Sequence, residues 1–197
     1  MPMPDSFLSR RRALVALGAA TLTPWALTGC DQTPPFVGID ITGADYATGF
    51  DLLDHNGQRR TLKDFEGKVV VVFFGFTQCP DVCPTAMGEL AQVKAALGKD
   101  GERLQGLFIS LDPERDTPEV LKAYMGNFDP GFLALRPTLE QLPEVTRHFK
   151  IFYKKNEGKT PGSYTLDHSA GSYVFDPQGR VRLYTRQGTG AAALADD

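Results

Sequence analysis

The feature that most constrains the fold is a run of six β-branched and aromatic residues at positions 69–74, Val-Val-Val-Val-Phe-Phe. Such a run predicts a strand that is buried on both faces of a sheet. A helical pattern of apolar residues follows, with Pro84 in its first turn and Gly98 at its end. The next apolar run, residues 107–111, then predicts a second strand. It should be parallel to the first, because a helical crossover joins the two.

Two cysteines lie between the first strand and the helix, in the segment Cys79-Pro80-Asp81-Val82-Cys83-Pro84. Turns at the carboxyl ends of parallel strands are where α/β proteins usually build their sites. Residues four apart on a helical turn lie about 5 to 6 Å apart, a spacing that suits chelation. The same spacing permits a disulfide, which needs Cα atoms within about 6.8 Å. These residues alone leave open a metal, a disulfide or both. We expect the positive end of the helix to lower the pKa of the two thiols.

The amino-terminal segment is typical of an export signal. Arg10, Arg11 and Arg12 precede an uncharged stretch, and Leu27-Thr28-Gly29-Cys30 resembles a bacterial lipobox. We therefore expect cleavage before Cys30 and a lipid on its thiol. The arginines fit a twin-arginine signal and an ordinary secretory leader equally well. The expected location is the periplasmic face of the inner membrane of a bacterial cell envelope, with a lipid anchor.

The chain is expected to divide into three parts. Residues 1–29 form the signal peptide, residues 30–48 a lipidated tether rich in Pro, Gly, Thr and Asp, and residues 49–197 one folded domain. Loss of the signal peptide removes three Arg and one Asp, which takes the formal net charge from −3 to −5. That charge argues against a nucleic-acid partner. Two cysteines in an oxidising compartment are expected to pair unless they are occupied or kept reduced.

The rest of the pattern completes an α/β domain, with Asn56-Gly57 as a strong signal for a hairpin turn. The predicted elements are a hairpin over residues 50–62, helices beginning at Thr117 and near Pro143, an edge strand at 151–153, a mobile polar loop over 154–164, a second hairpin over 172–184, and the start of a helix at 191–197.

Three segments together resemble the signatures of the Sco/SenC family, in matching order and spacing. They are Cys79-Pro80-Asp81-Val82-Cys83-Pro84, Asp112-Pro113-Glu114-Arg115-Asp116-Thr117-Pro118 and Asp167-His168-Ser169. The resemblance implies a thioredoxin-like fold, a central mixed sheet flanked by helices, with the first hairpin as an N-terminal extension. It also implies a membrane-tethered copper chaperone that binds one copper through Cys79, Cys83 and His168. The metal would be delivered to the binuclear copper site of cytochrome c oxidase subunit II.

The chemistry of these side chains agrees with that ligand set. Thiolates favour Cu(I) and imidazole accepts either oxidation state, so two cysteines and a histidine can hold copper through a redox change. If residues 172–175 lie antiparallel to residues 69–74, His168 comes next to the cysteine turn. Asp167 either orients the imidazole or tunes the charge of the site, or it is a surface turn residue. His55 and His148 are interpreted as structural.

Two other classes of function remain open at this point. Cys79 and Cys83 can form the redox-active disulfide of a thiol-disulfide oxidoreductase, with Cys79 as the attacking thiolate, or of a peroxidase-like protein. The three-residue gap between the cysteines and the presence of His168 favour copper, and hence a chaperone without turnover over an enzyme. Because metal and disulfide exclude each other, we expect a thioredoxin-like reductant to reset the site. Residues 112–116 are expected to shape the site or a docking surface, or to cap a helix.

Overall fold

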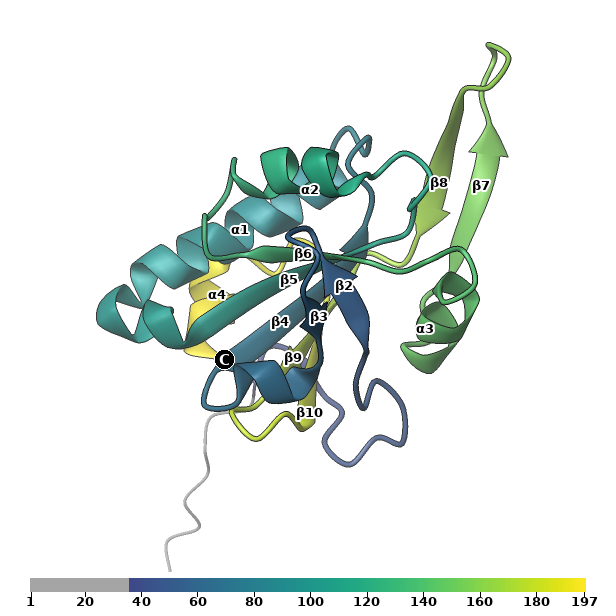
Figure 1. Ribbon diagram of the computed structural model, residues 1–197. Coiled ribbons are helices and arrows are strands. Elements are labelled where there is room, and N and C mark those ends of the chain that lie inside the picture. The colour runs from purple at the N-terminus through teal and green to yellow at the C-terminus, as the bar shows by residue number, and fades with distance from the viewer. Residues whose placement is uncertain (1–35) are drawn as a thin grey trace, which may run out of the picture. The chain divides into compact units, whose positions relative to one another are not determined.

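A mixed eight-stranded sheet forms the centre of the computed structural model, which describes residues 36–197 (Figure 1). Its strands, in spatial order, are β1 (Ile39–Asp40), β10 (Val181–Thr185), β9 (Ser172–Phe175), β4 (Val69–Gly75), β5 (Leu104–Ser110), β6 (Leu133–Arg136), β2 (Leu52–Asp54) and β3 (Arg59–Arg60). Two further strands, β7 (Tyr153–Glu157) and β8 (Tyr164–His168), form a separate hairpin. The helices are α1 (Val82–Ala96), α2 (Pro118–Met125), α3 (Leu142–His148) and α4 (Ala191–Asp196), with 3-10 turns η1 (Leu62–Phe65) and η2 (Gly98–Arg103).

The predicted strand–helix–strand unit is confirmed at the middle of this sheet. Strand β4 pairs in parallel with β5 from Val69 opposite Leu104 to Gly75 opposite Ser110. On its other side β4 pairs antiparallel with β9, with Phe73 opposite Ser172. The carboxyl end of β4 and the amino end of β9 therefore lie side by side, which is the arrangement that the predicted position of His168 requires.

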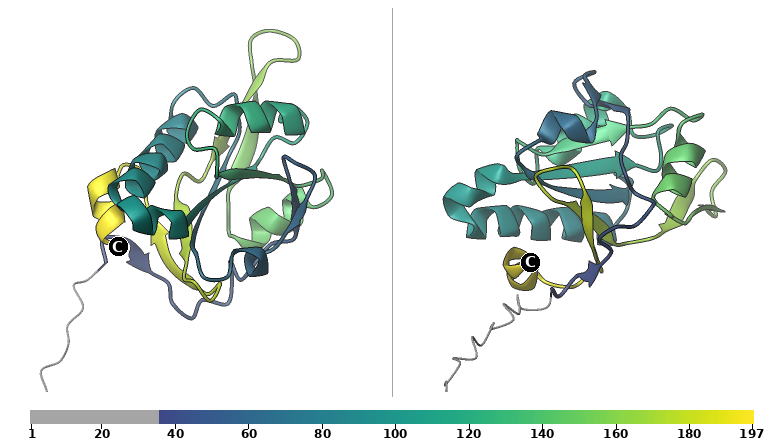
Figure 2. Two further views of the ribbon diagram at one scale, coloured as in Figure 1. Left: turned by 60° about the vertical axis from the view of Figure 1, so that its left-hand side comes forward. Right: turned by 90° about the horizontal axis from the view of Figure 1, so that it is seen from below.

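Alternate residues of β4 face opposite layers of the fold. Val71 and Phe73 line a cavity of about 290 Å³ with residues of α1 and α4, which lie side by side (Figure 2). Phe74 points to the other face, where its ring centroid lies 5.0 Å from that of Phe149, just after α3. Phe149 is fully buried and also contacts Tyr173 of β9, whose hydroxyl donates a hydrogen bond to the Phe149 carbonyl. The long apolar run of β4 is thus explained by layers on both of its faces.

The prediction for residues 151–164 was wrong in its boundaries. Ile151 lies outside any strand, and residues 154–157 and 164 of the expected loop belong to strands, because β7 pairs with β8 from Tyr153 opposite His168 to Glu157 opposite Tyr164. Residues 158–163 connect the two strands. Backbone hydrogen bonds hold these polar residues in strands without burying them in a core. The hairpin projects away from the central sheet (Figure 1).

The domain also begins earlier than residue 49. Ile39 and Asp40 pair with Tyr184 and Leu183 at the edge of the sheet, and Ala47 is fully buried. Residues 36–48 of the expected tether therefore belong to the folded domain. The predicted signal peptide and the lipid on Cys30 lie outside the described residues. Within residues 36–197, no helix is both long enough and apolar enough to cross a bilayer.

Strand β4 ends at Gly75, where the missing side chain makes room for a sulfur. A Cβ atom at this position would lie 2.7 Å from the Sγ of Cys83 and 2.9 Å from ring atoms of Phe73 and Phe108. Gly88 on α1 is the opposite case, because a Cβ atom there would meet nothing within 4 Å.

We expect Gly75→Ala to lower the free energy of unfolding by about 1–3 kcal/mol, since the added methyl group overpacks a filled core. Gly88→Ala is the matched control and should raise it by about 0.5–1 kcal/mol, because alanine loses less conformational entropy in a helix. Urea denaturation of the reduced proteins measures both changes. Equal stability of Gly75→Ala and the unchanged protein would contradict this account of the β4 terminus.

Candidate metal centre

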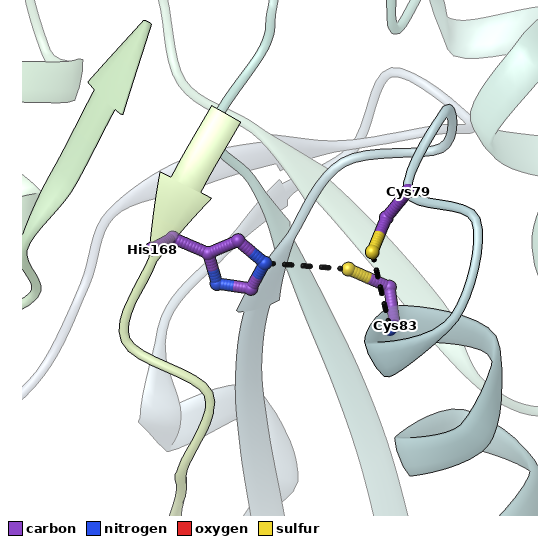
Figure 3. A group of neighbouring side chains, drawn as sticks. All are labelled: Cys79, Cys83 and His168. Atoms are coloured by element: carbon purple, nitrogen blue, oxygen red, sulfur yellow. Dashed lines mark hydrogen bonds between the residues drawn. The ribbon is translucent and has the colours of Figure 1, made fainter. Parts of the chain in front are cut away.

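Three side chains that are distant in sequence meet beyond the carboxyl end of β4. The Sγ atoms of Cys79 and Cys83 and a ring nitrogen of His168 all lie within 4.8 Å of one another (Figure 3). Cys79 lies in the turn after β4, Cys83 in the first turn of α1, and His168 at the end of β8. The structure thus brings together the three residues that the sequence nominated as ligands.

The cysteine turn is held by its own backbone. The amide of Cys79 donates to the carbonyl of Phe76 over 3.2 Å, and the amide of Cys83 points at the Sγ of Cys79 over 3.5 Å. Helix α1 begins at Val82, two residues before Pro84. Proline is tolerated there because the first-turn amides have no partner within the helix. A free amide at this helix end is therefore available to a sulfur.

Burial sets the protonation of Cys83. Its side chain has no exposed surface, and desolvation raises the pKa of this thiol far above its ordinary value. The expectation that the helix end lowers the pKa of both thiols is thus wrong for Cys83. The helix dipole stabilises a thiolate by less free energy than the removal of that thiolate from water costs. Without a metal, Cys83 is a neutral thiol.

The ring of His168 is fixed in one tautomer by its neighbour. Its Nδ1 lies 2.8 Å from the carbonyl oxygen of Ser169, which only accepts, so Nδ1 carries the proton. In the neutral ring Nε2 is then unprotonated, and it faces the Sγ of Cys83 at 3.5 Å. Burial lowers the pKa of His168, and the ring lies edge-on to Phe73 and Phe76. The result is a neutral imidazole with its free lone pair directed at the sulfurs.

Asp167 does not hold the imidazole, because that hydrogen bond goes to Ser169. Its side chain is exposed, and strand alternation directs it to the opposite face of β8 from His168. Its charge still acts on the site, since it counteracts the lowering of the His168 pKa. Asp167 thus lies in a strand and not in a surface turn, and its position agrees with tuning the charge of the site and not with orienting the imidazole.

Asp116, at the end of the segment 112–116 that was expected to shape the site, holds the cysteine turn with its buried carboxylate. Asp116 is fully buried and accepts hydrogen bonds from the hydroxyls of Thr77 and Ser110, each over 2.6 Å. It also accepts from the Thr77 amide over 3.2 Å. Burial raises the pKa of Asp116 despite these hydrogen bonds. The signal in the sequence was an acidic residue shortly after β5, at the edge where parallel strands end.

His55 and His148 have structural roles, as predicted, because each accepts a hydrogen bond from the backbone of a distant segment. The Ala134 amide donates to Nδ1 of His55 over 3.1 Å, and the Thr48 amide donates to Nε2 of His148 over 2.9 Å. Neither belongs to the three-residue cluster.

Comparisons with known proteins agree with this geometry. The sequence model of the SCO1/SenC family matches residues 40–197. The SCO2-like protein of Rickettsia prowazekii is 39% identical over 132 residues, which are 66% of this chain and 64% of that protein, just under two thirds of its length. The mitochondrial SCO2 homolog of Bos taurus is 36% identical over 149 residues, 75% of this chain and 56% of that protein.

Solved structures show the same fold. Bradyrhizobium japonicum ScoI with copper bound has a TM-score of 0.68 at 40% identity, covering 75% of this chain and 94% of its own. Yeast Sco1 with copper bound has a TM-score of 0.68 at 32% identity, covering 82% and 86%. The predicted thioredoxin-like fold with a central mixed sheet is confirmed. Because the family match spans nearly the whole described domain, the chain belongs to the SCO1/SenC family.

Proposed function

We propose that this protein binds one copper ion through Cys79, Cys83 and His168 and delivers it to the binuclear copper site of cytochrome c oxidase subunit II. The observation that carries the proposal is the convergence of two sulfurs and one imidazole nitrogen within 4.8 Å. Family membership supports it, as do the copper-bound structures of the bradyrhizobial and yeast relatives.

The donor set fits copper and its redox change. Soft thiolates select Cu(I), and the imidazole also suits Cu(II). The ligand is the thiolate, so loading must remove the proton that burial keeps on Cys83. The positive charge of the metal then replaces the proton as the counter-charge of the buried sulfur. His168 needs no such step, because its Nε2 already carries a free lone pair.

A second candidate function is thiol-disulfide exchange. Both cysteines are free thiols on one turn, and the Cys83 amide lies 3.5 Å from the Sγ of Cys79. Formation of the disulfide would remove two electrons and two protons and consume both sulfur ligands. A thioredoxin-like dithiol returns them through a mixed disulfide and is itself oxidised. In the copper chaperone this exchange is the step that prepares the site.

We also propose a location for the protein. Export by the segment 1–29 and a lipid on Cys30 would hold the domain at the periplasmic face of the inner membrane, where the disulfide and its reductant are relevant.

His168→Ala should weaken Cu(II) binding by at least about tenfold, because it removes one of three ligands. Adding Cu(II) to the reduced protein and following thiolate-to-copper charge-transfer absorption measures this. His148→Ala is the matched control and should bind as the unchanged protein does. Cys79→Ala should lose the absorption. One copper per chain, bound with undiminished affinity by His168→Ala, would contradict the ligand set.

His168→Ala also separates the two candidate functions. The disulfide uses sulfur atoms alone, so this variant should still exchange disulfides with reduced thioredoxin at a rate close to that of the unchanged protein. Stopped-flow measurement of the exchange provides the test. If the variant lost exchange and copper together, the imidazole would serve the redox chemistry as well.

Oxidation of Cys79 and Cys83 to the disulfide should abolish copper binding, and dithiothreitol should restore it, because both sulfur donors are consumed in the bridge. Competition with a chromophoric copper chelator under anaerobic conditions gives the affinity of each form. Equal affinities of the reduced and disulfide forms would refute the exclusion of one state by the other.

A further inference from the structure

His168 lies on a hairpin that is not part of the central sheet. Among residues 36–197, β7 and β8 pair only with each other. The hydrogen bonds at the base of the hairpin, between Phe152 and Ser169, also stay within it. The cysteines, by contrast, follow β4 and open α1. The pairing of β9 with β4 brings His168 near the cysteine turn, but within the described part of the chain β7 and β8 have no partner strand in the central sheet that would hold the hairpin against it. Side-chain contacts therefore have to hold the hairpin in place.

Arg115 connects the cysteine turn to the β7–β8 hairpin. Its Nη1 donates to Oε1 of Gln78, the residue directly before Cys79, over 2.9 Å. The same nitrogen donates to the carbonyl of Tyr164, the first residue of β8, over 2.9 Å. One guanidinium thus bonds to the cysteine turn and to the strand that ends in His168.

Asp112 contacts both Arg115 and the hairpin residue Tyr164. One of its oxygens accepts from Nε of Arg115, and the other accepts from the hydroxyl of Tyr164 over 2.8 Å. The guanidinium carbon lies 3.6 Å from the centroid of the Tyr164 ring, a stacking distance. Tyr164 is therefore held by its carbonyl, its ring and its hydroxyl. We call Asp112, Arg115 and Tyr164 the hairpin latch.

We propose that Arg115 is a positioning residue that, through the hairpin latch, fixes where His168 stands relative to Cys79 and Cys83. The proposal rests on the copper site proposed above. A ligand on a loosely attached element loses affinity through the ordering that binding then requires, and partners outside the ligand set usually supply that order.

The contacts demand arginine in particular. A planar guanidinium can donate to a carboxylate and to two further oxygens while it stacks on a ring. A lysine at position 115 can keep the charge opposite Asp112, but a single ammonium cannot reproduce the stacking and the fork of hydrogen bonds. Arg115→Lys should therefore retain part of the function.

The test compares Arg115→Gln with a matched loss of an ion pair elsewhere. Arg60, whose side chain is 24% exposed, pairs with fully buried Asp54 at the far edge of the sheet; Arg115 and Asp112 are 20% and 4% exposed. Arg115→Gln should weaken Cu(II) binding by at least about tenfold, Arg60→Gln should leave it unchanged, and Arg115→Lys should lie between. Equal losses in Arg115→Gln and Arg60→Gln would overturn the proposal.

Two readouts separate positioning from a general structural role. In Arg115→Gln loaded with Cu(II), the nitrogen coupling in the electron paramagnetic resonance spectrum should weaken while thiolate-to-copper absorption persists. In a His168→Ala background, Arg115→Gln should weaken binding no further, because its effect passes through that ligand. The same fold loss with and without His168 would show that Arg115 acts on the cysteines or on the whole fold, and would refute the proposal.

A measurement without copper distinguishes failure of this inference from failure of the proposed function. Amide hydrogen exchange in the copper-free protein should accelerate in β7 and β8 of Arg115→Gln, while β4 and β5 stay protected. This result would support the hairpin latch even if the unchanged protein bound no copper. Unaltered exchange in β8 would exclude the latch even if copper bound as expected.

Discussion

The pairing of β4 with two neighbours of opposite direction is the constraint on which the rest of the structure depends. The parallel neighbour β5 requires a crossover, and α1 with the cysteine turn is the start of that crossover. The antiparallel neighbour β9 runs the other way, so the chain that enters it arrives at the same edge and brings His168 with it. One strand, buried on both faces, thereby brings ligands from residues 79 and 168 to a single point.

Burial of the cysteine–histidine cluster determines the protonation state of Cys83 and His168. Cys83 and the His168 ring are neutral because a charge on either would be poorly solvated. The imidazole bonds to the carbonyl of Ser169, and the cysteine turn bonds to the carboxylate of Asp116. Gly75 leaves the space that the sulfur needs. The two sulfurs and the imidazole nitrogen are thus already close together in this structure.

Much of the fold and of the candidate site could be predicted from the sequence, because local sequence patterns reflect local structure. The apolar run of β4, the helix after the cysteines and the Asn56-Gly57 turn each follow from periodicity or backbone preference. The two-residue strand β1 and the polar hairpin β7–β8 could not, since their stability comes from backbone pairing with distant residues. The pKa of Cys83 depends on packing from several elements, and the contacts of Arg115 and Asp116 depend on side-chain geometry; neither leaves a periodic signal.

The two sulfurs differ in exposure, and this gives ligand exchange an order. Cys83 has no exposed surface, whereas Cys79 is half-buried and borders on solvent. In the function proposed above, an incoming donor atom from another molecule would reach a bound ion from the side of the two partly exposed ligands, Cys79 and His168. Substitution would then start with the loss of one of these two bonds and end with the loss of the bond to buried Cys83. The ion would thus stay attached to at least one of the two molecules throughout the transfer.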